Sequence, residues 1–240
     1  MWAHSVSGWA NSFMKDKAAA TVVVSGGGTA SGIEAVFKHE AEIAMASHFL
    51  GQDQKKAAGD LGLDLQEKLV SWDAVAFFVN RDNPVSQLTM DQARSLFMGQ
   101  VTRWKDVGGS DAPVELFIDE DPKSETSLLL RKLVLAGAEF ASTANLKRYP
   151  RFILQAVSTN KNGIGYAPIR RVIESQSAFP IKVLAMRRTE DEPGVQPSKE
   201  TIANQTYPVV FPLFFYWDGK SAGKPVTDFV AFCEEAGRPR

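Results

Sequence analysis

The sequence predicts an α/β fold, because strand-like apolar runs alternate with helix-like patterns along the whole chain. The clearest strand is the continuous apolar run 74–79, which is typical of a strand buried on both faces of a mostly parallel sheet. The clearest helix is capped by Thr89, has Asp91 in its first turn and continues through Phe97. With 240 residues, the chain is long enough for one large domain or two lobes.

The remaining elements follow from the same criteria: apolar runs indicate strands, and apolar positions on one side indicate helices. In 9–17, for example, Trp9 and Phe13 fall on one side of a helix. Pro212 interrupts the apolar run 209–217 and predicts a sheet edge or a kink there. Strands are expected at 21–25, 42–46, 74–79, 114–118, 163–167, 181–185 and 209–217. Helices are expected at 9–17, 31–39, 54–61, 89–97, 124–135, 152–158 and 227–236.

Charge, cysteine content and hydropathy exclude several classes of protein. A formal net charge of −1 without a basic run gives no support for binding to nucleic acid or to an anionic membrane. Cys233 is the one cysteine, so an intrachain disulfide is impossible, and its apolar helical surroundings predict a buried thiol. No apolar run reaches the roughly 18 residues of a membrane span. The first eight residues lack the basic start and apolar core of a signal peptide, so either the protein is cytoplasmic or its export signal lies outside this sequence.

The segment 22–37 joins a β-branched run to a helical pattern through the three glycines 26–28. Glycines let backbone N–H groups approach a ligand closely, and Thr29 and Ser31 can cap the start of the helix. A helix N-terminus offers unpaired N–H donors and the positive end of the helix dipole. The segment therefore predicts an anion-binding site, with a plain strand-to-helix turn as the alternative.

Two nucleotide-binding motifs fail in this loop because a required residue is missing. The outer spacing of a P-loop is present at Gly27 and Gly32, but the Lys and Ser or Thr that must follow are not. A dinucleotide fingerprint begins in the same loop, but Ser31 occupies the place of its third glycine. No nucleotide cofactor is therefore expected.

Patterns for catalysis and metal binding are missing as well. The chain lacks the G-x-S-x-G nucleophile motif, and its histidines are His4, His39 and His48. No cluster of Cys, His and Asp has the spacing of metal ligands. We therefore expect a non-enzymatic protein without cofactor or metal, with an enzyme on the same α/β framework as an alternative.

A second strand-to-helix junction at 116–128 repeats the arrangement of the first. Ser124, Thr126 and Ser127 place hydroxyl and N–H groups at a helix start, although such residues are often only caps. Two such junctions that face each other across a cleft would bind one small anion from both sides.

Six short motifs follow one another along nearly the whole chain. They lie at 22–32, 42–47, 73–83, 88–99 with 104–109, 124–127 and 162–166. Together they resemble the substrate-binding proteins of phosphate-type ABC transporters, which are periplasmic binding proteins. The resemblance implies a type II two-lobed α/β fold, in which two mixed sheets are joined by two crossing segments. Residues 1–78 and 168–240 would form one lobe, and residues 79–167 the other.

The same resemblance implies a function. The chain would be a non-enzymatic solute-binding protein that captures a small oxyanion, phosphate first, between its lobes for an ABC importer. Its partner would be an ABC permease in the membrane, and it would act as a monomer without nucleic acid. Its location would be periplasmic or extracellular and membrane-attached, with a signal peptide outside this sequence. The alternative is a sensory or interaction module of the same fold that has lost or changed its ligand.

The resemblance also implies which residues bind the ligand: they lie in the two loops and at Ser47, at the end of a strand. They are Ser25, Gly26, Gly27, Gly28, Thr29, Ser31, Ser47, Ser124, Thr126 and Ser127. A second, weaker group consists of Ser5, Ser7, His48, Glu120 and Lys123. Glu120 departs from the family, which usually has an arginine four residues before the serine of the second loop. The acidic triplet 119–121 is expected either to be solvated or to accept a proton from a protonated oxyanion, and Phe97 and Trp104 are expected in the core.

Overall fold

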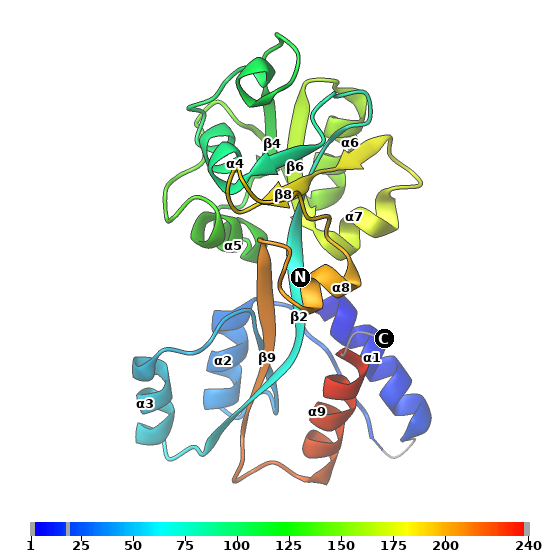
Figure 1. Cartoon of the computed structure of the whole chain (residues 1–240). Coiled ribbons are helices and arrows are strands. Elements are labelled where there is room, and N and C mark those ends of the chain that lie inside the picture. Colours follow the sequence, from blue (N-terminus) through cyan, green and yellow to red (C-terminus); the bar gives the residue numbers. More distant parts are fainter. Residues whose placement is uncertain (1–2, 18–19, 238–240) are drawn as a thin grey trace. The chain divides into compact units, whose positions relative to one another are not determined.

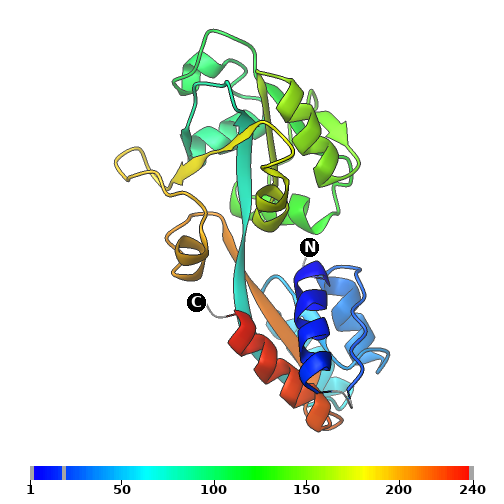
Figure 2. The ribbon, with the colours of Figure 1, turned by 90° about the vertical axis from the view of Figure 1, so that its right-hand side faces the viewer.

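The chain folds into α-helices and β-strands that alternate along the sequence (Figure 1, and turned by 90° in Figure 2). A computed structural model describes residues 3–17 and 20–237, with side chains from residue 6 onward. Within those residues, no helix has both the length and the apolar character that crossing a membrane requires. The predicted α/β class is confirmed.

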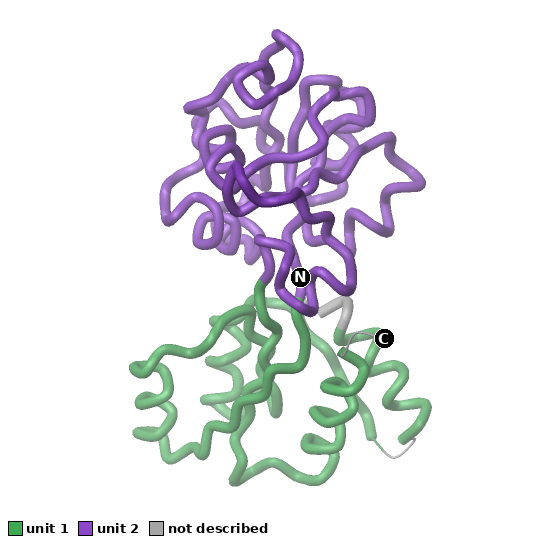
Figure 3. Tube along the Cα trace, in the orientation of Figure 1, with its two compact units in different colours: residues 1–72, 211–240 green, residues 73–210 purple. Residues whose placement is uncertain are grey.

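The chain forms two compact units, which are coloured separately in Figure 3. Unit 1 consists of residues 1–72 and 211–240, and unit 2 consists of residues 73–210. The chain therefore passes from one unit to the other twice, which fits the two expected crossing segments. The crossings lie at 72/73 and 210/211, whereas the expected boundaries were 78/79 and 167/168.

Residues 168–210 stay with unit 2 because they pair with its strands. β7 (Ile181–Val183) pairs antiparallel with the end of β2 (Leu65–Asn80), and β8 (Ala185–Arg187) pairs parallel with β3 (Gln87–Thr89). Pairings between segments so far apart in the chain leave no trace in the local sequence pattern, and this explains the displaced boundary.

The strands of unit 1 belong to a seven-stranded sheet that continues into unit 2, and helices pack on them. β1 (Ala44–Ala46) pairs antiparallel with β9 (Val210–Asp218), and the strand order continues to β2. The helices are α1 (Ala3–Asp16), α2 (Thr29–Phe37), α3 (Gln52–Asp60) and α9 (Lys224–Gly237). One core cluster joins α2, β1 and β9 and contains Ile33, Val36, Ala44, Ala46, Leu50, Phe214 and Tyr216.

Helices α1 and α9 run side by side in both ribbon views (Figures 1 and 2). Phe13 of α1 packs edge-on against Phe229 and Phe232 of α9, with ring centroids 5.2 and 5.4 Å apart. Cys233 is fully buried on α9, and burial raises the pKa of its thiol to about 12. The predicted buried thiol is therefore confirmed.

One expected strand in unit 1 is wrong, and one of the two alternatives for Pro212 is excluded. Residues 21–25 have no regular secondary structure, and Val23 is 84 % exposed. A β-branched run favours extended backbone, but a strand exists only where a second strand supplies partner N–H and C=O groups. Of the two alternatives for Pro212, a sheet edge is excluded, because β9 lies between β1 and β2, and a kink stays a prediction. β1 pairs only with 214–216, so Pro212 lies beyond its end and its missing N–H costs no bond to β1.

Unit 2 is built on a mixed sheet in the order β2-β6-β4-β5. β6 (Gly163–Pro168) is antiparallel to β2, while β4 (Glu115–Asp119) is parallel to both β6 and β5 (Asn145–Lys147). The run 74–79 of β2 is fully buried, as predicted. Its neighbours β6 and β7 are antiparallel to it, however, and not parallel as the apolar run suggested.

Helices connect the strands of unit 2. They are α4 (Met90–Phe97), the 3-10 helix η1 (Trp104–Val107), α5 (Glu125–Leu133), α6 (Pro150–Thr159), α7 (Ile169–Ser175) and α8 (Lys199–Ala203). The predicted cap of α4 is confirmed: the Thr89 hydroxyl accepts the Gln92 N–H at 3.1 Å, and the Gln92 side chain accepts the Thr89 N–H at 2.9 Å. The elements α7, α8, β3 and β5 were not predicted, because segments this short carry too little periodicity.

The core of unit 2 contains an aromatic cluster. Phe97 and Trp104 are buried, as predicted. The Phe97 ring lies 5.4 Å from Phe77 and 5.6 Å from Tyr166, and Phe140 stacks on Tyr166 at 5.8 Å. This packing fixes the ring of Tyr166, whose hydroxyl reaches the start of α5.

Candidate anion-binding site

The exposed loop 25–28 before α2 depends on backbone conformations that favour glycine. Gly27 and Gly28 have φ angles of 150° and 85°, which other residues rarely adopt. A Cβ atom on Gly27 would also lie 2.9 Å from the Ser31 hydroxyl. Gly28 is the N-cap of α2 and provides no side-chain cap, so the first N–H groups of the helix keep their capacity to bind an anion.

Thr29 and Ser47 come together in unit 1. Both are buried, and the Thr29 hydroxyl accepts the backbone N–H of Ser47 at 3.1 Å. The two hydroxyl oxygens lie 3.4 Å apart. The contact ties the first residue of α2 to the residue that follows β1. If one hydroxyl donates to the other, one hydroxyl hydrogen of the pair remains for a ligand.

Replacing Thr29 with Val should lower the free energy of unfolding by about 1–2 kcal/mol, because the buried Ser47 N–H loses its acceptor while the side-chain volume is kept. Urea unfolding measures the change. Ser31→Ala, on the exposed side of the same helical turn, is the control and should shift stability by less than about 0.5 kcal/mol. Equal losses in the two variants would show that the contact between Thr29 and Ser47 does not stabilise unit 1.

The other residues that were predicted to bind a ligand in unit 1 do not come together as Thr29 and Ser47 do. Ser25 and Ser31 are exposed, and His48 is half-buried. Ser7 lies inside α1 and not in a loop, while the side chain of Ser5 lies outside the described residues. Within unit 1, the structure thus joins Thr29 to Ser47 and leaves the two outer serines on the surface.

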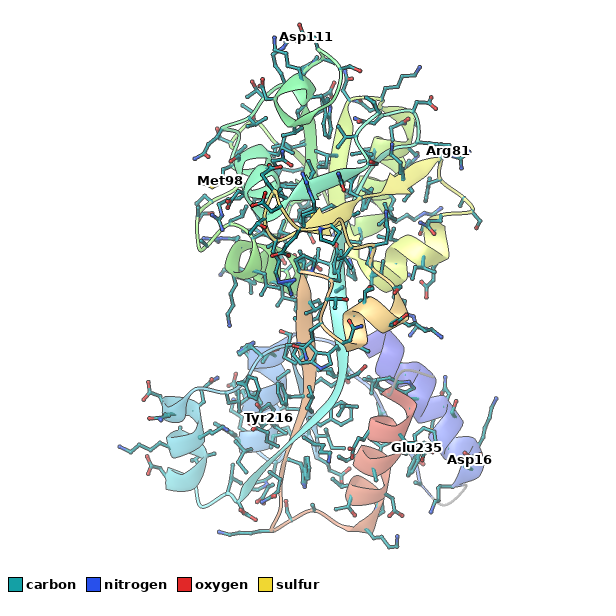
Figure 4. All side chains as sticks on the ribbon, viewed as in Figure 1. Asp16, Arg81, Met98, Asp111, Tyr216 and Glu235 are labelled. Atoms are coloured by element: carbon teal, nitrogen blue, oxygen red, sulfur yellow. The ribbon has the colours of Figure 1, made fainter. Side chains whose placement is uncertain are left out.

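The segment that carries Ser47 is held by Tyr216, which is labelled in Figure 4. The Tyr216 hydroxyl accepts the N–H of Leu50 at 3.1 Å and donates to Glu67 Oε2 at 2.8 Å. Burial raises the pKa of this phenol, and the neighbouring Glu67 carboxylate raises it further while the Leu50 N–H opposes the shift. Tyr216 therefore stays protonated and fastens the turn after β1 to β9.

The acidic loop between β4 and α5 uses carboxylates to hold its own backbone. Asp119 Oδ1 accepts the N–H of Asp121 at 3.0 Å, and Asp121 Oδ1 accepts the N–H of Lys123 at 2.9 Å. Asp119 is half-buried, whereas Asp121 and Lys123 are exposed. For these two aspartates the arrangement favours a solvated turn over a role in accepting a ligand proton.

Helix α5 is capped by Ser124, the serine that the sequence identified as a cap. The Ser124 hydroxyl accepts the Ser127 N–H at 3.3 Å and donates to the Ser127 hydroxyl at 3.0 Å. The Ser127 hydroxyl in turn lies 3.1 Å from that of Tyr166, whose pKa burial raises to about 12. Ser127 and Thr126 are buried. Ser124 and Ser127 thus act first as a cap and its support, and the cap uses the Ser127 N–H of the first turn.

Arg148 and Tyr166 contact this site but were not predicted. Arg148 follows β5, and its Nε lies 3.9 Å from Glu120 Oε1. An arginine directly after a short extended run was the available signal, but the pairing of β5 with β4 is not visible in the sequence. Tyr166 closes the motif at 162–166, which does not reveal where its hydroxyl points.

A cavity of about 210 Å³ lies at the other end of α2, away from the glycine loop. Val36, His39, Glu42 and Asp218 line it, and none of the residues predicted to bind a ligand does. Among the residues that the structure describes, no three His, Cys, Asp or Glu side chains are grouped so that they could hold a metal ion.

Known proteins share both sequence and fold with this chain. It is 27% identical over 229 residues to the phosphate-binding protein PstS of Staphylococcus saprophyticus, and the match covers 93% of this chain and 70% of that protein. An ABC-type phosphate transport receptor from Vibrio cholerae has the same fold, with a TM-score of 0.77, 24% identity and coverage of 97% and 89%. PstS from Borrelia burgdorferi gives a TM-score of 0.71, 20% identity and coverage of 96% and 88%.

A family profile described as the PBP superfamily domain matches residues 3–234, which is nearly the whole chain. The fold is thus the periplasmic-binding-protein-like α/β fold that the six motifs implied, and the resemblance to phosphate-type binding proteins is confirmed. The chain belongs to the PBP superfamily.

Proposed function

We propose that the chain is a non-enzymatic solute-binding protein that captures a small oxyanion, with phosphate as the first candidate. The supporting observation is that α2 begins after a glycine loop without a side-chain cap, while the Ser124 cap of α5 accepts one first-turn N–H, that of Ser127. Helix N-termini combine such donors with the positive end of the helix dipole. The relatives named as phosphate-binding proteins support phosphate among the small anions.

The proposal includes a transport partner and a location. An ABC permease receives the anion, and the protein works outside the cytoplasmic membrane, where an importer collects its substrate. It acts as a monomer without cofactor, metal or nucleic acid. The formal net charge of −1 supports the last point, because nucleic-acid binding draws on a basic surface.

Calorimetric titration with phosphate at pH 7 should give saturable heat. Ser124→Ala should weaken phosphate binding about fivefold, because loss of the cap, worth about 1 kcal/mol, loosens the first turn whose N–H groups hold the anion. The same titration with sulfate, molybdate and tungstate ranks the anions.

Ser198→Ala is the matched control for this test. The Ser198 hydroxyl caps α8 in the same manner, accepting the Thr201 N–H at 3.1 Å. This variant should lose comparable stability and keep the phosphate affinity of the wild type. A wild-type protein that gives no heat with any of the four anions would overturn the proposal and favour a binding-protein fold that has lost its ligand.

A further inference from the structure

The start of α5 carries an excess of negative charge. Asp119, Glu120 and Asp121 precede it, and Glu125 is its first residue. An anion that binds at the start of α5 meets repulsion from these carboxylates unless a cation offsets them. Asp119 and Asp121 are engaged with the loop backbone, so Glu120 is the carboxylate whose side chain an ion pair can reposition.

The parallel sheet of unit 2 brings Arg148 to this place. In the register of β4 and β5, Asp119 lies opposite Lys147. The N–H of Glu120 then donates to the Lys147 carbonyl at 3.0 Å, which extends the pairing one step beyond the strands. Arg148 directly follows β5 and Glu120 directly follows β4, so the two residues lie at the same end of the paired strands. Both lie at the carboxyl ends of parallel strands, the edge at which α/β sheets bind ligands.

The guanidinium of Arg148 is only loosely engaged there. Its Nε lies 3.9 Å from Glu120 Oε1, beyond hydrogen-bond distance, whereas Arg103 reaches Asp111 at 2.6 Å. The Arg148 side chain is 71% exposed, so water screens its ion pair with Glu120. An incoming anion can therefore displace the Glu120 carboxylate from Arg148 at little cost in free energy.

The ring of Tyr149 restricts the movement of the Arg148 guanidinium without engaging the N–H donors of that guanidinium. The guanidinium carbon lies 5.4 Å from the centroid of that ring. Contact with an aromatic face leaves the in-plane N–H groups of an arginine available for a planar pair of oxygen atoms.

We infer that Arg148 is a specificity-determining residue of the anion site: it binds the oxyanion through its guanidinium, and Glu120 is the counter-ion that it leaves when the anion arrives. The inference rests on the proposed function. It assigns the site to anions with two adjacent oxygen atoms, such as phosphate, because these accept paired N–H bonds from an arginine.

Calorimetry with inorganic phosphate at low ionic strength tests the inference on five proteins: wild type, Arg148→Gln, Arg148→Lys, Glu120→Gln and Arg151→Gln. Arg148→Gln should weaken binding at least about tenfold, and Arg148→Lys by about threefold, because lysine keeps the charge but not the paired donors. Glu120→Gln should tighten binding about two- to fivefold, because the competing carboxylate is removed. Arg151→Gln removes the same charge three residues further along and should change affinity less than about twofold.

Each outcome decides between the two proposals. If the wild type binds phosphate and Arg148→Gln binds it equally well, the inference is overturned and the proposed function stands. Equal weakening by Arg148→Gln and Arg151→Gln would reveal a general field effect and would also overturn it. A silent wild type would remove both proposals. Glu120→Gln keeps Arg148 in place, so its tighter binding would support the inference even if Arg148→Gln were poorly folded.

Discussion

Asp73→Asn should make the protein more stable at pH 8. Asp73 opens the second half of β2, and its Oδ1 accepts the Ala74 N–H at 2.8 Å. Burial raises the pKa of this carboxyl to about 7; Glu125 adds to the rise, while the Ala74 N–H and Arg170 oppose it. The ionised form is therefore the one that the folded state disfavours.

The sign of the pH dependence follows from this raised pKa. The folded state holds the proton more tightly than the unfolded chain, so the contribution of Asp73 to stability is complete below about pH 4 and is lost as the pH rises through 7. A rise of about three pKa units corresponds to about 4 kcal/mol at most, and partial solvent contact lowers this to about 2 kcal/mol. Asparagine keeps the acceptor for the Ala74 N–H and cannot ionise.

Urea unfolding of the wild type and the variant at pH 5, 6.5 and 8 measures the effect. The difference in stability between the two should grow across this range in favour of Asp73→Asn. Asp60→Asn, at the exposed end of α3, is the control and should follow the wild-type profile. A constant difference between Asp73→Asn and the wild type from pH 5 to 8 would contradict the assigned titration.

Gly165→Ala should destabilise unit 2 strongly. Gly165 lies in β6, and a Cβ atom there would clash with Cγ2 of Ile153. It would also lie 3.2 Å from both the Phe78 ring and Cγ2 of Val157. These neighbours are fully or almost fully buried and have no open space to move into. We expect a loss of about 3 kcal/mol, at the upper end of what an added methyl group costs in a packed core.

The same substitution at Gly59 provides the control. Gly59 lies within α3, and a Cβ atom there would meet nothing within 4 Å. Gly59→Ala should therefore raise stability by about 0.5–1 kcal/mol, because alanine favours helix more than glycine does. Thermal unfolding followed by circular dichroism compares the two variants. A melting temperature of Gly165→Ala within a degree of the wild type would show that helix α6 can move away from β6.

In the candidate site, the sequence predicts local features but not the contacts between distant segments. The glycine loop before α2 and the cap at Ser124 were recognised because each depends on residues a few positions apart. The sequence also showed that the acidic triplet 119–121 stands where the family usually has an arginine. It did not indicate that Asp119 and Asp121 hold the loop backbone. Nor did it indicate that Glu120 faces Arg148, because that contact depends on the register of β4 and β5.

The sequence by itself determined the α/β class, the buried run 74–79, the capped start of α4 and the buried thiol of Cys233. Each follows from periodicity or from a cap, and those signals lie within a few neighbouring residues. Only the tertiary structure decided that 21–25 has no partner strand, that the chain crosses between units at 210/211, and that Arg148 lies beside Glu120. A strand and an ion pair both require a second segment, and which distant segment arrives is set by the packing of the whole unit.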